Sequence, residues 1–474
     1  MSQLPAWGQA DLPAPPPFST RNMFRLVGPG AILLAASIGG GEWLVGPNIS
    51  VRYGMGVMWI ATVGIVLQVI LNLEAIRYTL YTGEPALSGI MRLRPGAHFW
   101  ATIYVLLTVA QLGIPALAKS CANVLYTAYY GPDVPVDESI LLTIAYAIMG
   151  GTVLLLMFGG TVERMLEIAS WLMIAYIFSF LIFINLFCVP FAHTWETFQG
   201  FFNFGYIPKG IDLLLLASLA ATAGSGGIGN LSISNWVRDK GFGMGSVVGA
   251  IPSVFGSTNV TLSHVGKTFP ITTENLSRWR MWWKYIVADQ VWLWAAGCFV
   301  GMFLNVNLAT AIIEPGSELK DSQVGIFQAQ YLAKHYWQGL WVLGLLNGFW
   351  ILFSTHLGNT DILVRTVTDM VWVASRTARK SKTLNVGKLY YVLLFVFTLW
   401  GGIVIRFGSA IQLFKVLAAI AGVVLIPASI QMLIINSTML PRELRPSWWR
   451  RIGLVACALF YAAVTAAVLF DKLK

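Results

Sequence analysis

The chain has 474 residues, of which 57% are hydrophobic and only 11% are charged. Because a soluble domain carries about a quarter charged residues, this composition excludes a soluble globular protein and indicates one that crosses a membrane several times. The net charge of +10 comes from basic residues between the apolar runs, so we predict the lipid bilayer, and no nucleic acid, as a partner.

The chain opens with a polar, proline-rich segment, residues 1–20, which we predict to be a disordered tail. Residues 21–474 are then expected to form a single all-α transmembrane domain. A helix needs about 20 mostly apolar residues to cross a bilayer. Eleven runs meet this length: 26–49, 56–80, 99–127, 138–159, 164–190, 211–237, 284–306, 337–374, 387–405, 411–438 and 452–470.

Basic residues set the predicted orientation of these spans. If the N-terminus lies in the cytoplasm, most of the 31 lysines and arginines fall in cytoplasmic segments, as the positive-inside rule requires. We therefore predict a multi-pass protein of the cell membrane with its N-terminus in the cytoplasm and its C-terminus outside.

Glycine clusters interrupt the first and the sixth apolar run. Unwound backbone at membrane depth is tolerated only where it lines a cavity or is buried in protein. Two such breaks at matching places in two halves of a chain point to the substrate site of a transporter, whereas close helix packing through small residues is the alternative. The predicted substrate-binding set is Gly39, Gly40, Gly41, Glu42, Ser225, Gly226, Gly227 and Asn230.

Glu42 is the first residue that we single out within this set. A carboxylate at membrane depth is costly unless it is paired, protonated or hydrated, so a functional role is the default. It would coordinate a cation, bind a cationic solute or carry a proton; the alternative is a structural role in capping the amides of the unwound helix. Asn230 is either a second metal ligand or the cap of the half-helix that follows it.

Other polar residues inside the spans are candidates for coupling. His356 is a candidate proton carrier because the pKa of histidine lies near neutrality, and the alternative is a packing residue. Asp289, near the start of the seventh run, is a second relay candidate. Asp361 and Arg365 are four residues apart, which allows a structural salt bridge.

Several classes of function lack their motifs. The chain contains no phosphate-binding P-loop, no nucleophile elbow and no His or Cys cluster with metal-ligand spacing. We therefore predict that the protein is not an enzyme, holds no cofactor and does not hydrolyse ATP.

The first and second runs resemble the Nramp (natural resistance-associated macrophage protein) divalent-metal transporters. The resemblance lies in Gly28-Pro29-Gly30 followed by the Gly39–Trp43 segment at the family's spacing, in Thr82-Gly83-Glu84, and more loosely in Ala418–Pro427. It implies the LeuT-type fold, with 26–190 and 211–438 as inverted five-helix repeats and 452–470 as an extra helix. It also implies secondary transport, coupled to protons, at a site between the two broken helices.

The departures from the family's metal site affect the expected substrate. Gly39 stands at the position of its aspartate, Glu42 at its asparagine, Gly227 at its methionine and Gly229 at its histidine. Oxygen ligands without a thioether favour a hard divalent cation such as Mg²⁺ or Mn²⁺ over soft metals. Two alternatives stay open: a transporter of an amino-acid-like organic solute, and a receptor or scaffold that does not transport.

Overall fold

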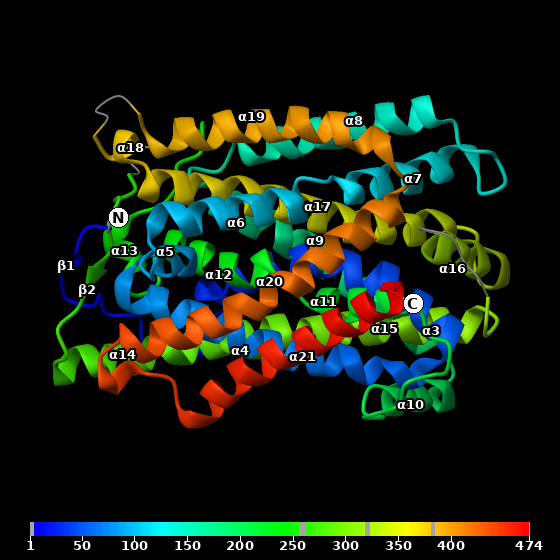
Figure 1. Ribbon diagram of the computed structural model, residues 1–474. Helices are drawn as coiled ribbons and strands as arrows, with labels where there is room; N and C mark the ends of the chain where they lie inside the picture. The colour runs from blue at the N-terminus through cyan, green and yellow to red at the C-terminus, as the bar shows by residue number, and fades with distance from the viewer. Residues whose placement is uncertain (1–3, 256–260, 318–322, 381–383, 474) are drawn as a thin grey trace.

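The computed structural model describes residues 4–255, 261–317, 323–380 and 384–473. The chain forms an elongated bundle of helices that run along its long axis, with the N-terminus and the C-terminus at opposite ends (Figure 1). Within the described residues, nine helices or continuous runs of helix are long and apolar enough to cross a bilayer: Met55–Thr82, Ala97–Tyr130, Glu138–Leu156, Val162–Cys188, Thr273–Ile312, Leu340–Ala374, Val386–Phe407, Gln412–Thr438 and Trp448–Asp471. The protein is therefore a multi-pass membrane protein.

The sixth span is broken, and the first is bent at its start and widened by a π-helix at its glycine cluster. The first comprises α2 (Pro29–Ser37), the π-helix η1 (Gly39–Val45) and α3 (Gly46–Tyr53), and it is bent by 58° against α1 (Thr20–Leu26). The sixth comprises two arms, α11 (Leu213–Thr222) and α12 (Ile228–Asp239). With the bent first span the described residues contain up to ten helices that could cross a bilayer, and the predicted sixth run is present as the two short arms α11 and α12.

The unbroken spans follow the predicted runs closely. The third is interrupted at Gly113–Pro115, and the seventh continues through a second π-helix. Their elements are α4 (Trp59–Thr82), α6 (Ala97–Leu112), α7 (Ala116–Tyr130), α8 (Glu138–Leu156), α9 (Val162–Cys188), α14 (Thr273–Val287), η3 (Ala288–Ala295), α15 (Ala296–Ile312), α17 (Leu340–Ala374), α19 (Val386–Val404), α20 (Ala410–Thr438) and α21 (Trp448–Leu473).

Short elements connect the spans at the two ends of the bundle. Within the described residues, the connection after the seventh span carries helix α16. The short elements are η2 (Met55–Met58), α5 (Ala86–Met91), α10 (Phe191–Gly200), α13 (Gly245–Val248), α16 (Gln323–His335), α18 (Arg376–Lys380), η4 (Ile405–Phe407), η5 (Arg442–Leu444), and the strands β1 (Gly8–Gln9) and β2 (Lys267–Thr268).

The N-terminal tail is packed against the bundle, so the prediction of a disordered tail is wrong for residues 4–19. Strand β1 pairs in parallel with β2, and Leu12 is fully buried. The Leu12 amide donates to Asn275 Oδ1 at 3.3 Å, and Trp282 Nε1 donates to the Pro13 carbonyl at 2.9 Å. Proline cannot donate backbone hydrogen bonds, but its carbonyl accepts them, and polar side chains of α14 supply the donors.

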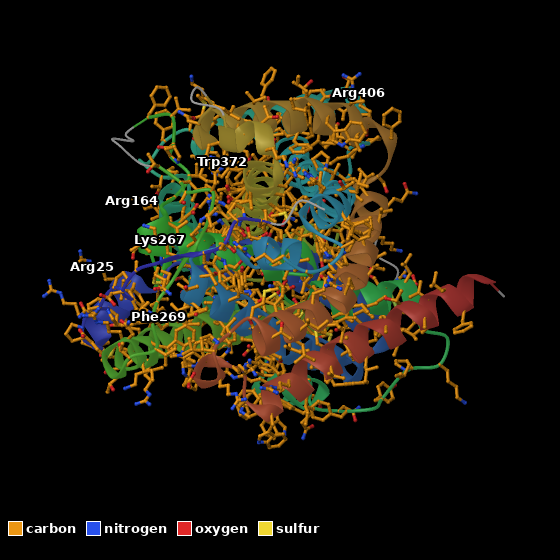
Figure 2. The ribbon with its side chains drawn as sticks, turned by 60° about the vertical axis from the view of Figure 1, so that its left-hand side comes forward. Arg25, Arg164, Lys267, Phe269, Trp372 and Arg406 are labelled. Carbon is orange, nitrogen blue, oxygen red and sulfur yellow. The ribbon has the colours of Figure 1, made fainter. Side chains whose placement is uncertain are left out.

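Burial places the broken spans at the centre of the bundle. All nine residues of α2 are buried, whereas α9, α19 and α21 expose large apolar side chains, as lipid-facing helices do. Arg25, Arg164 and Lys267 lie toward one end of the molecule and Arg406 lies toward the other (Figure 2).

Candidate functional site

The first glycine cluster does not unwind the helix. Residues Gly39–Val45 form a π-helix in which the Gly46 amide donates to the Gly41 carbonyl, so the prediction of unwound backbone at Gly39–Glu42 is wrong. Glycine is required here by close packing. A methyl group on Gly41 would lie 1.9 Å from the Thr222 carbonyl oxygen, so the two broken spans touch through their backbones. A π-turn is a frequent feature of functional sites.

The second glycine cluster does interrupt its helix. Helix α11 ends at Thr222 and α12 begins at Ile228, so the non-helical segment is Ala223–Gly227. Asn230, which we predicted as part of the break, lies in the first turn of α12. Gly226 and Gly227 have φ values of 63° and 60°, a conformation that glycine adopts without strain.

Two glutamines from neighbouring spans hold the backbone of this break. Gln68 Oε1 accepts from the Gly226 amide at 3.1 Å, and Gln68 Nε2 donates to the Ala221 carbonyl at 3.3 Å. Gln111 Nε2 donates to the Gly226 carbonyl at 3.0 Å, and its Oε1 accepts from the Ile228 amide at 3.2 Å. The hydrogen bonds that the helix loses are thus replaced by side chains, as buried backbone requires.

Serine hydroxyls join the two breaks. Ser37 Oγ and Ser225 Oγ are 3.2 Å apart, and Trp294 Nε1 donates to Ser37 Oγ at 3.3 Å. Trp294 is fully buried, whereas Ser225 keeps partial exposure. Ser225 of the sixth span and Ser37, two residues before the first glycine cluster, therefore meet between α2, α11 and η3.

Glu42 lies in the π-helix next to this junction. Its side chain is fully buried, and neither carboxyl oxygen has a hydrogen-bond partner in the part of the chain that the structure describes. The groups that interact with the Glu42 carboxyl group are its own backbone amide and the Cys298 thiol, whereas the structural alternative required it to cap the amides of an unwound helix. A buried carboxyl group without a partner is costly, which makes Glu42 the strongest candidate for a binding residue.

One sulfur atom of α15 lies beside Glu42, and a second lies one turn further along the helix. The Cys298 thiol is close enough to interact electrostatically with the Glu42 carboxyl group. Met302, one helical turn further along α15, packs against Gly46, where an added methyl group would lie 2.3 Å from Met302 Sδ. The sixth span offers no sulfur ligand at Gly227, whereas the seventh span carries the sulfur atoms of Cys298 and Met302.

Asn230 and Asp289 belong to a separate chain of hydrogen bonds. Asn230 Nδ2 donates to Asn72 Oδ1 at 2.9 Å, and Asn72 Nδ2 donates to Gln290 Oε1 at 3.1 Å. Asp289 accepts from Gln290 Nε2 at 2.8 Å and from the amides of Gly28 and Gly30 at 3.0 and 2.7 Å. Asp289 thus holds the start of α2.

The predicted metal pair is not assembled in this arrangement. No hydrogen bond joins Asn230 to Glu42 among the described residues, although Asn230 Oδ1 is buried and lacks a partner. The described residues also contain no group of three or more His, Cys, Asp or Glu side chains that could hold a metal ion.

His356 lies apart from both breaks. It is buried, its Nε2 has no partner among the described residues, and it lines a cavity of about 40 Å³ between α7, α8, α17 and α19 together with Thr152, Asn359 and Thr360. Its neighbour Thr355 supports the first break instead, because Thr355 Oγ1 accepts from the Gly39 amide at 2.8 Å.

The sequence analysis did not single out Gln68, Asn72, Gln111, Trp294 or Cys298. A signal for three of them was present, since Gln68, Asn72 and Gln111 are uncharged polar residues inside otherwise apolar runs. Such residues are buried only with hydrogen-bond partners. Trp294 and Cys298 gave no signal, because both occur in any apolar helix.

The architecture is that of the LeuT-type transporters. The manganese transporter of Eremococcus coleocola, in complex with an aromatic bis-isothiourea substituted compound, has a TM-score of 0.63 at 14% identity over 97% of this chain and 90% of that one. MhsT with L-phenylalanine has a TM-score of 0.53 at 12% identity, over 93% and 97%. Mhp1, a nucleobase-cation-symport-1 family transporter with bromovinylhydantoin bound, has a TM-score of 0.50 at 13% identity, over 94% and 93%.

Similarity at these identities establishes the fold of the chain, as the sequence predicted, and not its substrate. No protein-family model and no curated protein sequence matches the chain.

Proposed function

We propose that the protein is a secondary active transporter, related to the Nramp family, that binds a divalent cation beside the junction of its two broken spans. The observation that carries this proposal is the Glu42 carboxyl group, which is fully buried, lacks a hydrogen-bond partner among the described residues and lies next to the break of the sixth span. Broken helices that meet near mid-membrane are where transporters of this fold place their substrates.

The oxygen atoms around the junction support a hard cation. The Glu42 carboxyl group supplies the charge, and the hydroxyls of Ser37 and Ser225, 3.2 Å apart, supply neutral oxygens. One carboxylate with neutral oxygens suits an ion that keeps part of its water, such as Mg²⁺, or the more adaptable Mn²⁺. The Cys298 thiol adds a softer donor, so Cd²⁺ is expected to compete with these ions.

An amino-acid-like solute is the second candidate. In that case the amides of the breaks would receive the solute's carboxylate and Glu42 would bind its amine. The described contacts support this less well, since Thr355 occupies the Gly39 amide and the two glutamines occupy those of Gly226 and Ile228.

Uptake into liposomes tests both candidates. Purified protein is assayed with Mg²⁺, Ca²⁺, Mn²⁺ and amino acids, with and without a pH gradient, beside the Glu42→Gln variant. We expect saturable uptake of at least one divalent cation that depends on Glu42. Uptake of amino acids alone would favour the second candidate, and no uptake of any solute would favour a receptor or scaffold and contradict the proposal.

A further inference from the structure

A second carboxyl group without a partner lies outside the junction. Glu163 occupies the first turn of α9, its side chain is only 3% exposed, and its Oε1 has no hydrogen-bond partner within the described residues. A buried carboxyl oxygen without a hydrogen-bond partner is costly. Nothing in the contacts of the two broken spans uses it.

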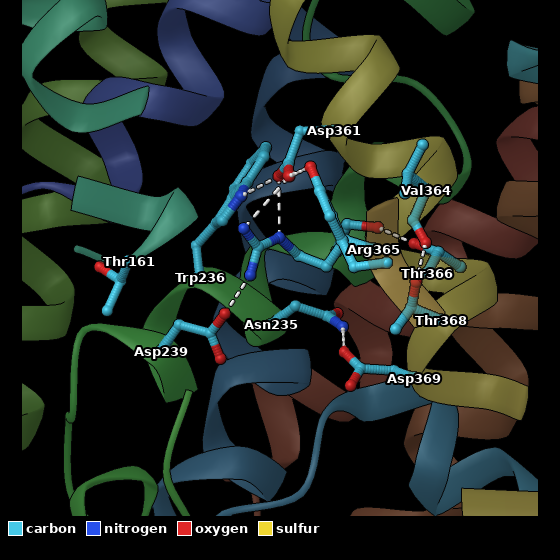
Figure 3. A network of polar contacts seen from close by, with 12 residues as sticks. Thr161, Asn235, Trp236, Asp239, Asp361, Val364, Arg365, Thr366, Thr368 and Asp369 are labelled. Atoms are coloured by element: carbon cyan, nitrogen blue, oxygen red, sulfur yellow. Dashed lines mark hydrogen bonds and ion pairs between the residues drawn. The ribbon is translucent and has the colours of Figure 1, made fainter. Parts of the chain in front are cut away.

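The charged groups around Glu163 come from the end of α12, from α17 and from α9 itself. Asp239 and Lys240, at the end of α12, and Arg365, on α17, interact with it electrostatically, as does Glu167 one turn further along α9. Figure 3 shows the start of α9, marked by Thr161, on the same side of the network as Asp239. Asp289 also interacts electrostatically with Lys240.

Each of the four other carboxyl groups in the network around Arg238, Lys240 and Arg365 has a cationic partner. Glu167 pairs with Lys240, and Asp239 pairs with both Arg365 and Arg238. Further along, Arg365 binds Asp361 at 2.8 Å and Arg238 binds Asp369 at 2.9 Å.

Hydrogen bonds from neighbouring side chains complete those pairs. Trp236 and Tyr390 donate to Asp361 at 2.8 and 2.6 Å, and Asn235 donates to Asp369 at 2.5 Å (Figure 3).

Glu163 therefore adds a negative charge that the cluster does not balance. Glu163, Glu167, Asp239, Asp361 and Asp369 are five carboxyl groups facing three bases, Arg238, Lys240 and Arg365. A buried site with an excess of negative charge favours uptake of a cation. Because Lys240 and Arg365 interact electrostatically with Glu163, they would repel a metal ion there, whereas a proton on a carboxyl oxygen needs no coordination shell.

We propose that Glu163 is a proton-binding site, separate from Glu42. It exchanges protons with water at the end of the bundle where the N-terminal tail packs. Glu167 and Lys240 keep 15% and 17% of their side chains exposed, so water reaches the cluster next to Glu163.

The same ion pair packs against the start of the first span. A methyl group on Gly28 would lie 2.6 Å from Glu167 Oε1 and 3.1 Å from Lys240 Nζ. The ion pair next to Glu163 therefore lies at the bend between α1 and α2. Binding of a proton by Glu163 does not depend on the function proposed above. Only an effect of this proton on transport rests on that function.

Infrared spectroscopy tests the occupancy directly. Difference spectra of the purified full-length protein between acidic and alkaline buffer are recorded for the wild type, Glu163→Gln, Glu42→Gln and Glu167→Gln. We expect a carboxylic-acid C=O band that Glu163→Gln abolishes and that the other two variants retain. A folded Glu163→Gln protein whose difference spectrum equals that of the wild type overturns the proposal.

Chemical labelling tests the same point without a substitution. Dicyclohexylcarbodiimide reacts with protonated carboxyl groups in apolar surroundings, and peptide mass spectrometry locates the adduct. We expect labelling of Glu163 in the wild-type protein that falls as the pH rises, and absence of label at every pH contradicts the proposal.

In liposomes, the stimulation of Mn²⁺ uptake by a pH gradient should be lost in Glu163→Gln. If no solute is transported by the wild type, the proposed function fails while the infrared band still decides the occupancy of Glu163.

Discussion

The side-chain amide of Gln111 bridges the break of the sixth span at Gly226. Its Nε2 donates to the Gly226 carbonyl at 3.0 Å, while its Oε1 accepts from the Ile228 amide at 3.2 Å. Gln111 lies at the end of α6 and is almost fully buried. One side chain of the third span thus supplies the hydrogen bonds that the interrupted helix lacks on both sides of the break.

Replacing Gln111 should therefore destabilise the break. Gln111→Ala leaves a buried carbonyl and a buried amide without partners, which we expect to cost about 2 kcal/mol of unfolding free energy. Thermal unfolding in detergent measures the change. Gln199→Ala, at an exposed position of α10, is the control and should change little. Equal stability of the two variants would show that water replaces the Gln111 amide.

Removing the charge of Glu42 should impair transport and spare the fold. Glu42→Gln keeps the volume of the side chain, and its carboxyl oxygens have no hydrogen-bond partner to lose among the described residues. We expect uptake to fall at least tenfold, which corresponds to about 1.4 kcal/mol, with protein yield and thermal stability nearly unchanged. Normal uptake would remove Glu42 from the site, and loss of folding together with uptake would restore its structural role.

Cys298 should control competition by soft metals. Its thiol lies beside the Glu42 carboxyl group, and thiolate ligands favour soft ions whereas hydroxyl oxygens do not. Cys298→Ser is expected to weaken the inhibition of Mn²⁺ uptake by Cd²⁺ about tenfold, which is about 1.4 kcal/mol, and to affect inhibition by Mg²⁺ much less. Cys457→Ser, on α21, serves as the matched control. Identical Cd²⁺ inhibition in both variants would place the thiol outside the site.

Glu84, in the turn between α4 and α5, should make stability depend on pH. Burial raises the pKa of its carboxyl group, but the Arg92 guanidinium at 2.5 Å, with the Tyr78 hydroxyl and the Gly266 amide, holds the pKa below its ordinary value. As the pH falls, the unfolded chain binds a proton here before the folded chain does. This stabilisation is therefore fully present above about pH 4.3, the ordinary value, and is lost as the pH falls through the lowered pKa.

The Glu84→Gln variant measures this contribution. At neutral pH we expect it to lose about 3 kcal/mol, since it leaves the largely buried Arg92 without its partner. The difference from the wild type should narrow in acid, where the wild-type carboxyl group is protonated as well. Glu443→Gln, at an exposed position of η5, is the control. A difference that stays constant with pH would show that the charge of Glu84 does not contribute.

Some parts of the candidate site could be predicted from the sequence because they depend on local pattern. The break at Gly226 and Gly227 follows from adjacent glycines in an apolar run, and the Asp361–Arg365 pair follows from helical spacing; its Nε–Oδ2 distance is 2.8 Å. The tail could not be predicted in this way. Its composition lacks the apolar residues of a core. Leu12 is nevertheless buried, because side chains of α14 form hydrogen bonds with the backbone of Leu12 and Pro13.

Sequence alone determined that this protein crosses a membrane, where its spans lie and which two of them carry glycine clusters, because apolar length and glycine content are properties of each segment by itself. Tertiary structure decided what each cluster does. Gly41 packs against the Thr222 carbonyl and its helix widens into a π-turn, whereas Gly226 leaves its helix and is held by Gln68 and Gln111. These outcomes depend on residues more than a hundred positions apart, which meet only when the spans pack together.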